Sequence, residues 1–257
     1  MELVNKVAVI TGGSGGIGAA MAKAFLAEGV RGVMLADLDA EAVKAISSEI
    51  GCEGMVCDVT NENEVQELVT VAESKFGQID LFCSNAGKGH AGVLTDVEDD
   101  DWDTQWNLHV MAHMYAARAV LPGMLKRGEG YLLNTASAAG LLAALSAGAY
   151  TVTKAASVKL AEFLAITHGD EGIRVSVLCP QGVNTAMGPK TLGDGQTDGI
   201  LEPDELARVV VETIYTERFY VLPHPEVEEY VRRKGDNIDR WLHGMRRLRK
   251  KSINLTN

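Results

Sequence analysis

The chain has 257 residues, of which 46% are hydrophobic and 23% are charged, the usual balance of a globular protein with a sizeable core. Its formal net charge is −11. Because proteins that bind nucleic acids usually carry an excess of Lys and Arg, this charge argues against DNA or RNA as a partner.

Short apolar runs alternate with longer helical patterns along the whole chain. In chain order, the runs typical of buried strands occupy residues 7–10, 33–36, 54–57, 79–83, 131–134, 174–178 and 219–222. Helical patterns lie between them, up to about residue 28, over 39–50, from 61, over 99–127 and 148–168, and from about 203. After residue 61, for example, Val65, Leu68, Val69, Ala72 and Phe76 recur at the spacing of one helix face.

This alternation predicts the fold class. A strand, a helix and a second strand in succession form a right-handed crossover, and repeated crossovers give a parallel sheet that is covered on both faces. We therefore predict an α/β fold, a doubly wound, Rossmann-like parallel sheet of about seven strands with helices on both faces. No change of composition marks a boundary, so residues 1–257 are interpreted as a single domain.

Two segments differ from this pattern. Residues 186–202 are polar and rich in Gly, and they follow a strand end, where ligands bind in such folds, so we predict a substrate loop. Residues 225–251 are predicted to form a helical tail whose apolar face covers either a neighbouring subunit or its own domain. We interpret the basic residues 246–251 as a solvated helix end, favoured by the helix dipole, rather than as a site for an anionic partner.

A glycine-rich turn, residues 11–18, connects the first predicted strand to the first helix. Glycines there let the backbone approach a pyrophosphate, and the helix N-terminus offers free N–H groups. Because this pattern lies between a strand and a helix, it is more specific than a glycine pattern alone and predicts a dinucleotide site. The predicted contacts are Gly12, Ser14, Gly15, Gly16, Ile17 and Gly18.

The end of the second strand indicates which dinucleotide binds. Asp37 lies there, and its carboxylate can accept hydrogen bonds from the adenosine ribose while repelling a 2′-phosphate. Leu38 follows it, and the glycine-rich turn has no Arg or Lys. We therefore predict NAD rather than NADP. The alternative is that Asp37 only caps the next helix, a role for which Asp39 competes.

Three polar side chains are candidates for catalysis. Tyr150 and Lys154 lie one helical turn apart and so project from the same face. A phenol has a pKa of about 10, and a nearby ammonium lowers it towards neutrality, which suits a general acid or base. Ser137 follows the fifth strand, where its hydroxyl can bind the oxygen of a substrate.

With Asn85-Ala86-Gly87, these motifs resemble those of the short-chain dehydrogenase/reductase family. The family's Thr-Gly-x-x-x-Gly-Ile-Gly corresponds to residues 11–18, its serine to Ser137, and its Tyr-x-x-x-Lys to Tyr150 and Lys154. The resemblance covers residues 5–225 and indicates the NAD-type branch of ordinary length. It implies a single domain that binds NAD and carries out hydride transfer.

The resemblance also implies further contacts with the cofactor. Asp58 and Val59 are expected beside the adenine, Asn85 near the cofactor between the central strands, and Lys154 at the nicotinamide ribose. The segment after the sixth strand resembles the family's Pro-Gly-x-Val-x-Thr, with Gln181 in place of the glycine. The remaining expected contacts are Ala86, Gly87, Tyr150, Pro180, Gly182, Val183 and Thr185, with Val183 and Thr185 at the carboxamide.

His109 departs from the family pattern. It occupies the helix position where the family usually has an Asn that is thought to hold a proton-relaying water. One interpretation is a tolerated substitution that still binds this water. The other is that His109 joins the relay as a catalytic residue and adds a titration near neutral pH.

Three functions are compatible with the sequence. The first is an NAD-dependent oxidoreductase that interconverts a secondary alcohol and its ketone, with Tyr150 as general acid or base. The apolar residues 138–142 favour a hydrophobic, alicyclic or aromatic substrate. The alternatives are a non-catalytic NAD-binding sensor or structural subunit, and an isomerase or dehydratase of the same fold.

The sequence also gives expectations for cell location and assembly. The cysteines, Cys52, Cys57, Cys83 and Cys179, are scattered, which predicts no metal site and no disulfide framework. There is no apolar stretch of about 20 residues and no secretory leader pattern, so we expect a cytoplasmic protein without membrane contact. The family resemblance implies a homotetramer or homodimer with a small-molecule alcohol or ketone as substrate.

Overall fold

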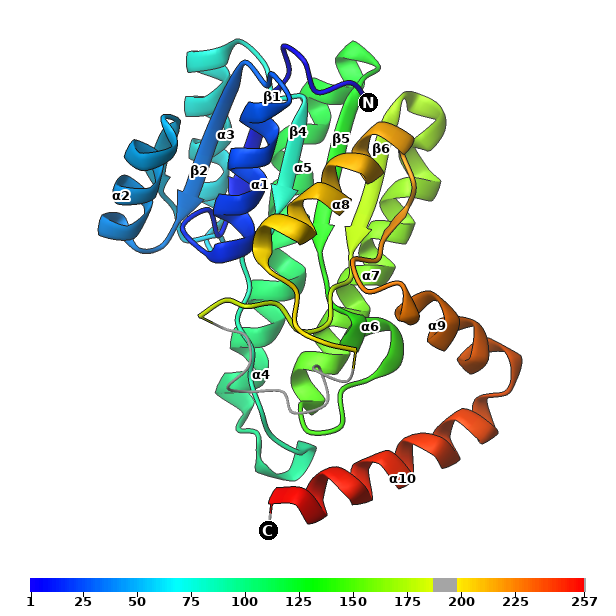
Figure 1. Cartoon of the computed structure of the whole chain (residues 1–257). Coiled ribbons are helices and arrows are strands. Elements are labelled where there is room, and N and C mark those ends of the chain that lie inside the picture. The colour runs from blue at the N-terminus through cyan, green and yellow to red at the C-terminus, as the bar shows by residue number, and fades with distance from the viewer. Residues whose placement is uncertain (187–197, 257) are drawn as a thin grey trace.

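The computed structural model describes residues 1–186 and 198–256, and it has the predicted α/β architecture (Figure 1). The strands are β1 (Val7–Thr11), β2 (Gly32–Asp37), β3 (Glu53–Val56), β4 (Leu81–Ser84), β5 (Gly130–Thr135), β6 (Ile173–Leu178) and β7 (Tyr220–Val221). They form one sheet in the order β3-β2-β1-β4-β5-β6-β7, and every neighbouring pair is parallel. The fold class predicted from the alternating pattern is confirmed.

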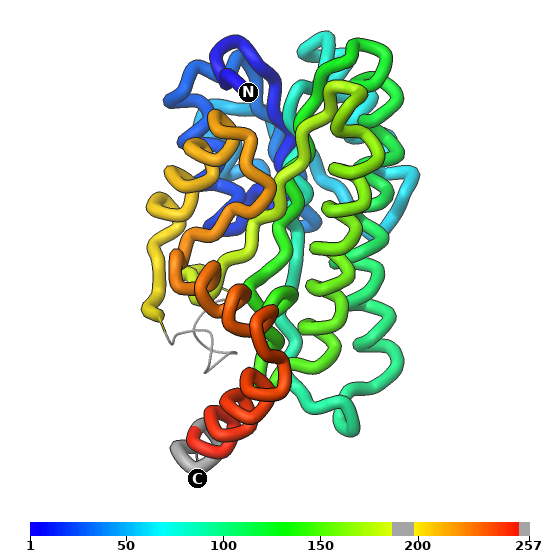
Figure 2. The backbone as a smooth tube through the Cα atoms, turned by 90° about the vertical axis from the view of Figure 1, so that its right-hand side faces the viewer, coloured from blue at the N-terminus to red at the C-terminus, as the bar shows by residue number. Residues whose placement is uncertain are grey.

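Helices cover both faces of this sheet, as Figures 1 and 2 show. On one face lie α1 (Gly16–Ala27), α2 (Ala40–Ile50) and α8 (Pro203–Thr216). On the other lie α3 (Glu62–Phe76), α5 (Ala112–Arg127) and α7 (Gly148–His168). The central strands are therefore buried on both sides, and each residue of β1 and β5 is buried, as a continuous apolar run predicts for a parallel sheet.

Local sequence signals explain where these helices start and stop. The Asn61 side chain accepts a hydrogen bond from the N–H of Asn63 and so caps α3, while Asp39 accepts one from Ala42 and caps α2. Gly51 ends α2 with a φ of 78°, a left-handed conformation that glycine adopts without steric cost. Caps of this kind each contribute about 1 kcal/mol of helix stability.

The helix predicted over residues 99–127 is interrupted in the structure. It consists of α4 (Asp99–Trp106), a π-helical turn (Asn107–Met111) and α5. The carbonyl of His109, inside that turn, accepts a hydrogen bond from Ser157 Oγ at 2.6 Å. The π turn therefore fixes the position of His109 against α7, in a place where such turns often accompany functional sites.

The predicted tail also consists of two helices, not one. The structure shows α9 (Glu226–Asp236) and α10 (Ile238–Thr256), separated by Asn237. Asn237 has extended backbone angles, φ −157° and ψ 95°, and its side-chain oxygen accepts the N–H of Arg240 at 2.9 Å. It therefore acts as the N-cap of a new helix. Among the described residues no helix has the length and apolarity needed to cross a membrane.

Candidate active site

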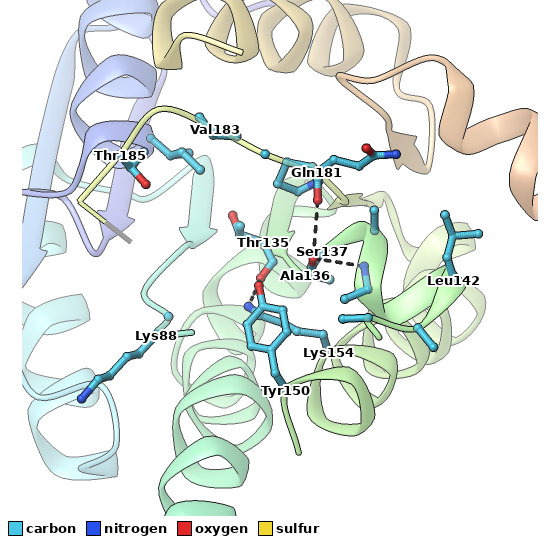
Figure 3. Close-up of a pocket in the computed structure, with 18 of the residues that line it drawn as sticks. Lys88, Thr135, Ala136, Ser137, Leu142, Tyr150, Lys154, Gln181, Val183 and Thr185 are labelled. Carbon is cyan, nitrogen blue, oxygen red and sulfur yellow. Dashed lines mark hydrogen bonds between the residues drawn. The ribbon is translucent and has the colours of Figure 1, made fainter. Parts of the chain in front are cut away.

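A cleft of about 1490 Å³ lies at the carboxyl ends of the strands, the edge at which doubly wound sheets bind their ligands. Figure 3 shows a part of it that contains Ser137, Tyr150 and Lys154. Most residues predicted for the site line this cleft. They are Gly12, Ser14, Gly15, Gly16, Ile17, Asp37, Leu38, Asp58, Val59, Asn85, Ala86, Gly87, Ser137, Tyr150, Lys154, Pro180, Gly182, Val183 and Thr185.

The glycine-rich turn has the shape that close approach of a ligand requires. Gly12 has a φ of +62°, and a Cβ there would lie 2.8 Å from Cα of Ala86. At Gly18 a Cβ would lie 2.3 Å from the carbonyl oxygen of Gly12. Gly18 does not line the cleft, so its role is to let α1 pack against the turn.

The N-terminus of α1 faces the cleft. No side chain caps this helix at Gly15, and Gly15, Gly16 and Ile17 all line the cleft. The first N–H groups of a helix have no partner within the helix, and they carry the positive end of its dipole. This part of the cleft therefore suits the pyrophosphate of a dinucleotide.

Asp37, at the end of β2, is hydrogen-bonded to the glycine-rich turn. Its Oδ2 accepts hydrogen bonds from Ser14 N at 3.0 Å and Ser14 Oγ at 2.5 Å. Because Asp39, and not Asp37, caps α2, the capping alternative for Asp37 is wrong. The Asp37 carboxylate lines the cleft instead, beside the exposed side chain of Leu38.

Asn85 connects three neighbouring strands below the cleft. Its Nδ2 donates to the Thr11 carbonyl at 3.1 Å, its N–H donates to Thr11 Oγ1 at 3.0 Å, and its Oδ1 accepts from Thr135 Oγ1 at 3.1 Å. The ends of β1, β4 and β5 are thereby held together. These contacts place Ala86 and Gly87 on the cleft wall.

Ser137, Tyr150 and Lys154 converge on the middle of the cleft (Figure 3). Ser137 starts the short helix α6 (Ala138–Leu142), where its hydroxyl accepts the N–H of Ala139 at 3.1 Å. Tyr150 and Lys154 come from the buried face of α7. Lys154 Nζ donates to the Thr135 carbonyl at 2.9 Å and lies 5.7 Å from the centre of the Tyr150 ring.

Without a bound ligand, burial is the main influence on the protonation of Tyr150 and Lys154. It raises the pKa of the Tyr150 phenol above its ordinary value, and a hydrogen bond with Ser137 offsets only part of this rise. Burial also lowers the pKa of Lys154 to about 7. Because burial favours the neutral form of both groups, the lowered phenol pKa predicted from sequence depends on added positive charge in the cleft.

The segment after β6 crosses the top of the site, as Figure 3 shows for Gln181, Val183 and Thr185. The Gln181 side chain, which replaces the family's glycine, donates from Nε2 to Asp198 Oδ2 at 2.8 Å. The other oxygen of Asp198 accepts from Tyr230 Oη at 2.9 Å. Gln181 thus connects this segment to α9. The predicted loop 186–202 is described only at its ends, because residues 187–197 lie outside the described residues.

Comparison with known proteins decides the family. The sequence profile of the short chain dehydrogenase family matches residues 6–194. The chain belongs to the short-chain dehydrogenase/reductase family. It is therefore an oxidoreductase with a dinucleotide-binding Rossmann-like fold, as the resemblance of its motifs predicts.

Individual members of the family match most of the chain, from 81% to 95% of its length. An uncharacterized oxidoreductase of Staphylococcus aureus (strain USA300) is 33% identical over 81% of this chain and 90% of its own length. The 1-deoxy-11-beta-hydroxypentalenate dehydrogenase of Streptomyces exfoliatus is 30% identical over 95% of this chain and 91% of its own. A short chain dehydrogenase/reductase from Burkholderia phymatum, solved in complex with NAD, is 32% identical with a TM-score of 0.85, covering 93% of this chain and 96% of that one.

His109, which stands at the family's usual Asn position, is fully buried and has both ring nitrogens engaged. Nε2 accepts the N–H of Lys88 at 3.3 Å, so Nδ1 carries the proton and faces Thr153 Oγ1 at 2.9 Å. Burial and the nearby Lys154 charge hold the pKa of His109 far below its ordinary value. His109 is therefore neutral near pH 7, and the hypothesis that it titrates there is not supported.

His109→Asn is expected to leave the pH dependence of kcat/KM unchanged while lowering stability. The shorter amide cannot keep the contacts with both Lys88 and Thr153, and leaving a buried polar group unpaired costs about 1–3 kcal/mol. Denaturant unfolding and a pH–rate profile measure the two effects. His90→Asn, at a partly exposed His outside the cleft lining, is the control. A displaced pH–rate profile in His109→Asn alone would show that His109 titrates.

Part of the cleft was missed by the sequence analysis. Thr135 and Ala136 lie at the carboxyl end of β5, and Lys88 follows the Asn-Ala-Gly motif. Their position beside recognised motifs is the signal that could have found them. The larger omission is the tail, since α9, α10 and the residue between them contribute to the lining Tyr230, Arg232, Arg233, Asp236, Asn237, Arg240, Trp241, Gly244, Met245, Arg247 and Leu248.

Proposed function

We propose that the protein is an NAD-dependent dehydrogenase that interconverts a hydrophobic, alicyclic or aromatic secondary alcohol and its ketone. The observation that carries this proposal is the convergence of Ser137, Tyr150 and Lys154 in one cleft with the glycine-rich turn. A protein that only binds the dinucleotide does not require these three side chains together. Their arrangement fits acid–base chemistry at the oxygen of a substrate.

In oxidation, Tyr150 takes the hydroxyl proton of the alcohol while the carbinol carbon gives up a hydride. NAD, when bound, is the acceptor of that hydride. Ser137 holds the substrate oxygen by a hydrogen bond, and Lys154 in its protonated form stabilises the Tyr150 phenolate. In the reverse direction Tyr150 returns the proton to the ketone oxygen. The buried surroundings of Tyr150 strengthen these interactions because they exclude water.

The wall beside Ser137 supports a hydrophobic substrate. It consists of the apolar residues Ala138, Ala139, Leu142, Ala143 and Ala144, and Ile200 adds a further apolar side chain to the cleft. Such walls favour apolar skeletons, and a few polar groups orient the reacting atoms. The relative from Streptomyces exfoliatus is named as a dehydrogenase of a hydroxylated compound, in agreement with an alcohol as the reduced substrate.

Asp37 supports NAD rather than NADP, because its carboxylate lines the cleft and would repel a 2′-phosphate. The structure from Burkholderia phymatum was solved with NAD. A homodimer or homotetramer fits the exposed apolar residues of α7, where Phe163 is 63% and Ile166 80% exposed. The four free cysteines suit the reducing cytoplasm.

The test is a panel of alicyclic and aromatic secondary alcohols and ketones with each dinucleotide. We expect NADH formation from at least one alcohol with NAD, and oxidation of NADH by the matching ketone, both followed by absorbance. Calorimetric binding of NADH is measured in parallel. Unchanged NADH absorbance across the whole panel, with NADH bound, would contradict the proposed reaction.

A further inference from the structure

The helices α9 and α10 form an arm on the substrate side of the cleft. Lys234 Nζ on α9 donates to the Leu141 carbonyl, and Arg249 Nε on α10 lies 3.4 Å from the Leu145 carbonyl. Both acceptors belong to α6 or the segment after it, next to Ser137. In Figures 1 and 2, α10 extends below the carboxyl ends of the strands. The arm therefore faces the substrate half of the cleft rather than the N-terminus of α1.

One face of α10 lines the cleft and combines apolar and cationic side chains. Its members recur at intervals of three or four residues, the spacing of a single helix face. They are Arg240, Trp241, Gly244, Met245, Arg247 and Leu248. A substrate in this half of the cleft would therefore meet an aromatic ring and aliphatic chains together with two guanidinium groups.

Arg240 and Arg247 differ from the other two arginines of the arm that line the cleft, Arg232 and Arg233. Arg232 forms ion pairs with Glu229 and Asp236, and Arg233 pairs with Glu229. In contrast, the guanidinium groups of Arg240 and Arg247 have no ion pair or hydrogen bond with any described residue, although both line the cleft. Their charge remains available to a ligand.

Four carboxylates line the same cleft, and none of them pairs with Arg240 or Arg247 among the described residues; Asp37 is bound to Ser14 and Asp58 to Thr60. Asp198 already accepts hydrogen bonds from Gln181 and Tyr230, and Asp236 is paired with Arg232. Within α10 as a whole, six Lys and Arg residues accompany a single acid, Asp239. In a chain of net charge −11, this helix is a local cationic element that presents free guanidinium groups beside an apolar wall.

We propose that the substrate carries a carboxylate at the end remote from its reacting carbon, and that Arg240 and Arg247 bind this group. The inference rests on the proposed function, since it names the chemical class of the substrate for the same site. Guanidinium groups bind carboxylates through paired, charge-assisted hydrogen bonds. The apolar skeleton lies between Trp241 and the α6 wall, while the alcohol or ketone carbon lies at Tyr150.

The test compares 4-(4-acetylphenyl)butanoate with its methyl ester, two ketones that differ at the remote end by the negative charge and one methyl group. With NADH, we expect the acid to have a kcat/KM about tenfold higher than the ester, a modest factor because both arginines are partly solvated. In Arg240→Gln/Arg247→Gln this acid-to-ester ratio is expected to fall to about one. Added salt is expected to lower the ratio of the wild type, because it screens the ion pairs.

The matched control is Arg246→Gln/Lys250→Gln. It removes the same charge from the same helix at two exposed positions outside the cleft lining, so the wild-type ratio is expected to persist. Equal kcat/KM for acid and ester in the wild type would overturn the inference, and so would an equal fall in both double variants.

A binding measurement tests the carboxylate site even if the proposed reaction does not occur. If neither ketone is reduced, calorimetric binding of the acid and the ester to the NADH complex decides the inference on its own. Tighter binding of the acid that is lost only in Arg240→Gln/Arg247→Gln supports the carboxylate site. Equal binding of acid and ester overturns it, whatever reaction the enzyme performs.

Discussion

Tyr150→Phe is expected to lower kcat by about a thousandfold or more while NADH binding is retained. The substitution removes only the hydroxyl, and general acid–base catalysis typically contributes about 10²–10⁴ to the rate. The ring stays, so its edge-on contact with His109, at 5.4 Å between ring centres, is preserved. Steady-state rates with the best alcohol of the panel and calorimetric titration with NADH measure the two effects.

Tyr131→Phe is the matched control for this result. Tyr131 is also buried, and its hydroxyl lies 2.6 Å from Ser176 Oγ, but it does not line the cleft. The control is expected to keep its activity and to lose about 1 kcal/mol of stability with the hydrogen bond. If Tyr150→Phe kept more than about a tenth of the wild-type rate, a factor too small for general acid–base catalysis, Tyr150 would not be the proton donor.

The sheet could be predicted because each of its signals is local. A short, largely apolar run such as Val7–Thr11 is typical of a strand that is buried on both faces. Caps such as Asp39 and Asn61 mark where the next helices begin. The strand ends also place the glycine-rich turn and the Asn-Ala-Gly motif at one edge, so most residues of this part of the cleft lining could be predicted from the sequence.

The features that were not predicted depend on contacts between distant residues. The π turn at His109 is stabilised by Ser157 from α7, and no local pattern signals that contact. Similarly, the sequence showed that the tail is amphipathic, but not where it packs. Its position beside α6 depends on contacts such as that of Lys234 with the Leu141 carbonyl. Residues far apart in sequence lack the periodicity that reveals one helix or one strand.

The pKa shifts of Tyr150 and Lys154 also depend on contacts that the sequence does not reveal. From sequence, Lys154 is a charged neighbour that lowers the pKa of Tyr150. In the folded protein, both side chains are buried, and burial raises the pKa of Tyr150 and lowers that of Lys154 to about 7. The balance between desolvation and charge depends on the packing around both groups, which spacing alone cannot reveal. The proposed preference for NAD rests on a simpler interaction, the repulsion expected between Asp37 and a 2′-phosphate.

The wild type is expected to use NAD at least about a hundredfold more efficiently than NADP in kcat/KM. Two like charges about 4 Å apart repel by about 4 kcal/mol at the effective dielectric of a protein surface, and partial exposure of Asp37 reduces this value. In Asp37→Asn the repulsion disappears, so kcat/KM for NADP is expected to rise about tenfold or more. Activity with NAD falls because the ribose loses a charged acceptor.

Asp39→Asn makes the same chemical change two residues along the chain, at a position outside the cleft lining. Asn caps helices about as well as Asp, so α2 is expected to remain stable and the preference for NAD unchanged. Initial rates with both dinucleotides, or their calorimetric binding, measure the preference of each variant. Because the two variants carry the same net charge, a shift towards NADP in Asp37→Asn alone would assign the discrimination to the carboxylate beside Ser14. Equal shifts in both would assign it to overall charge.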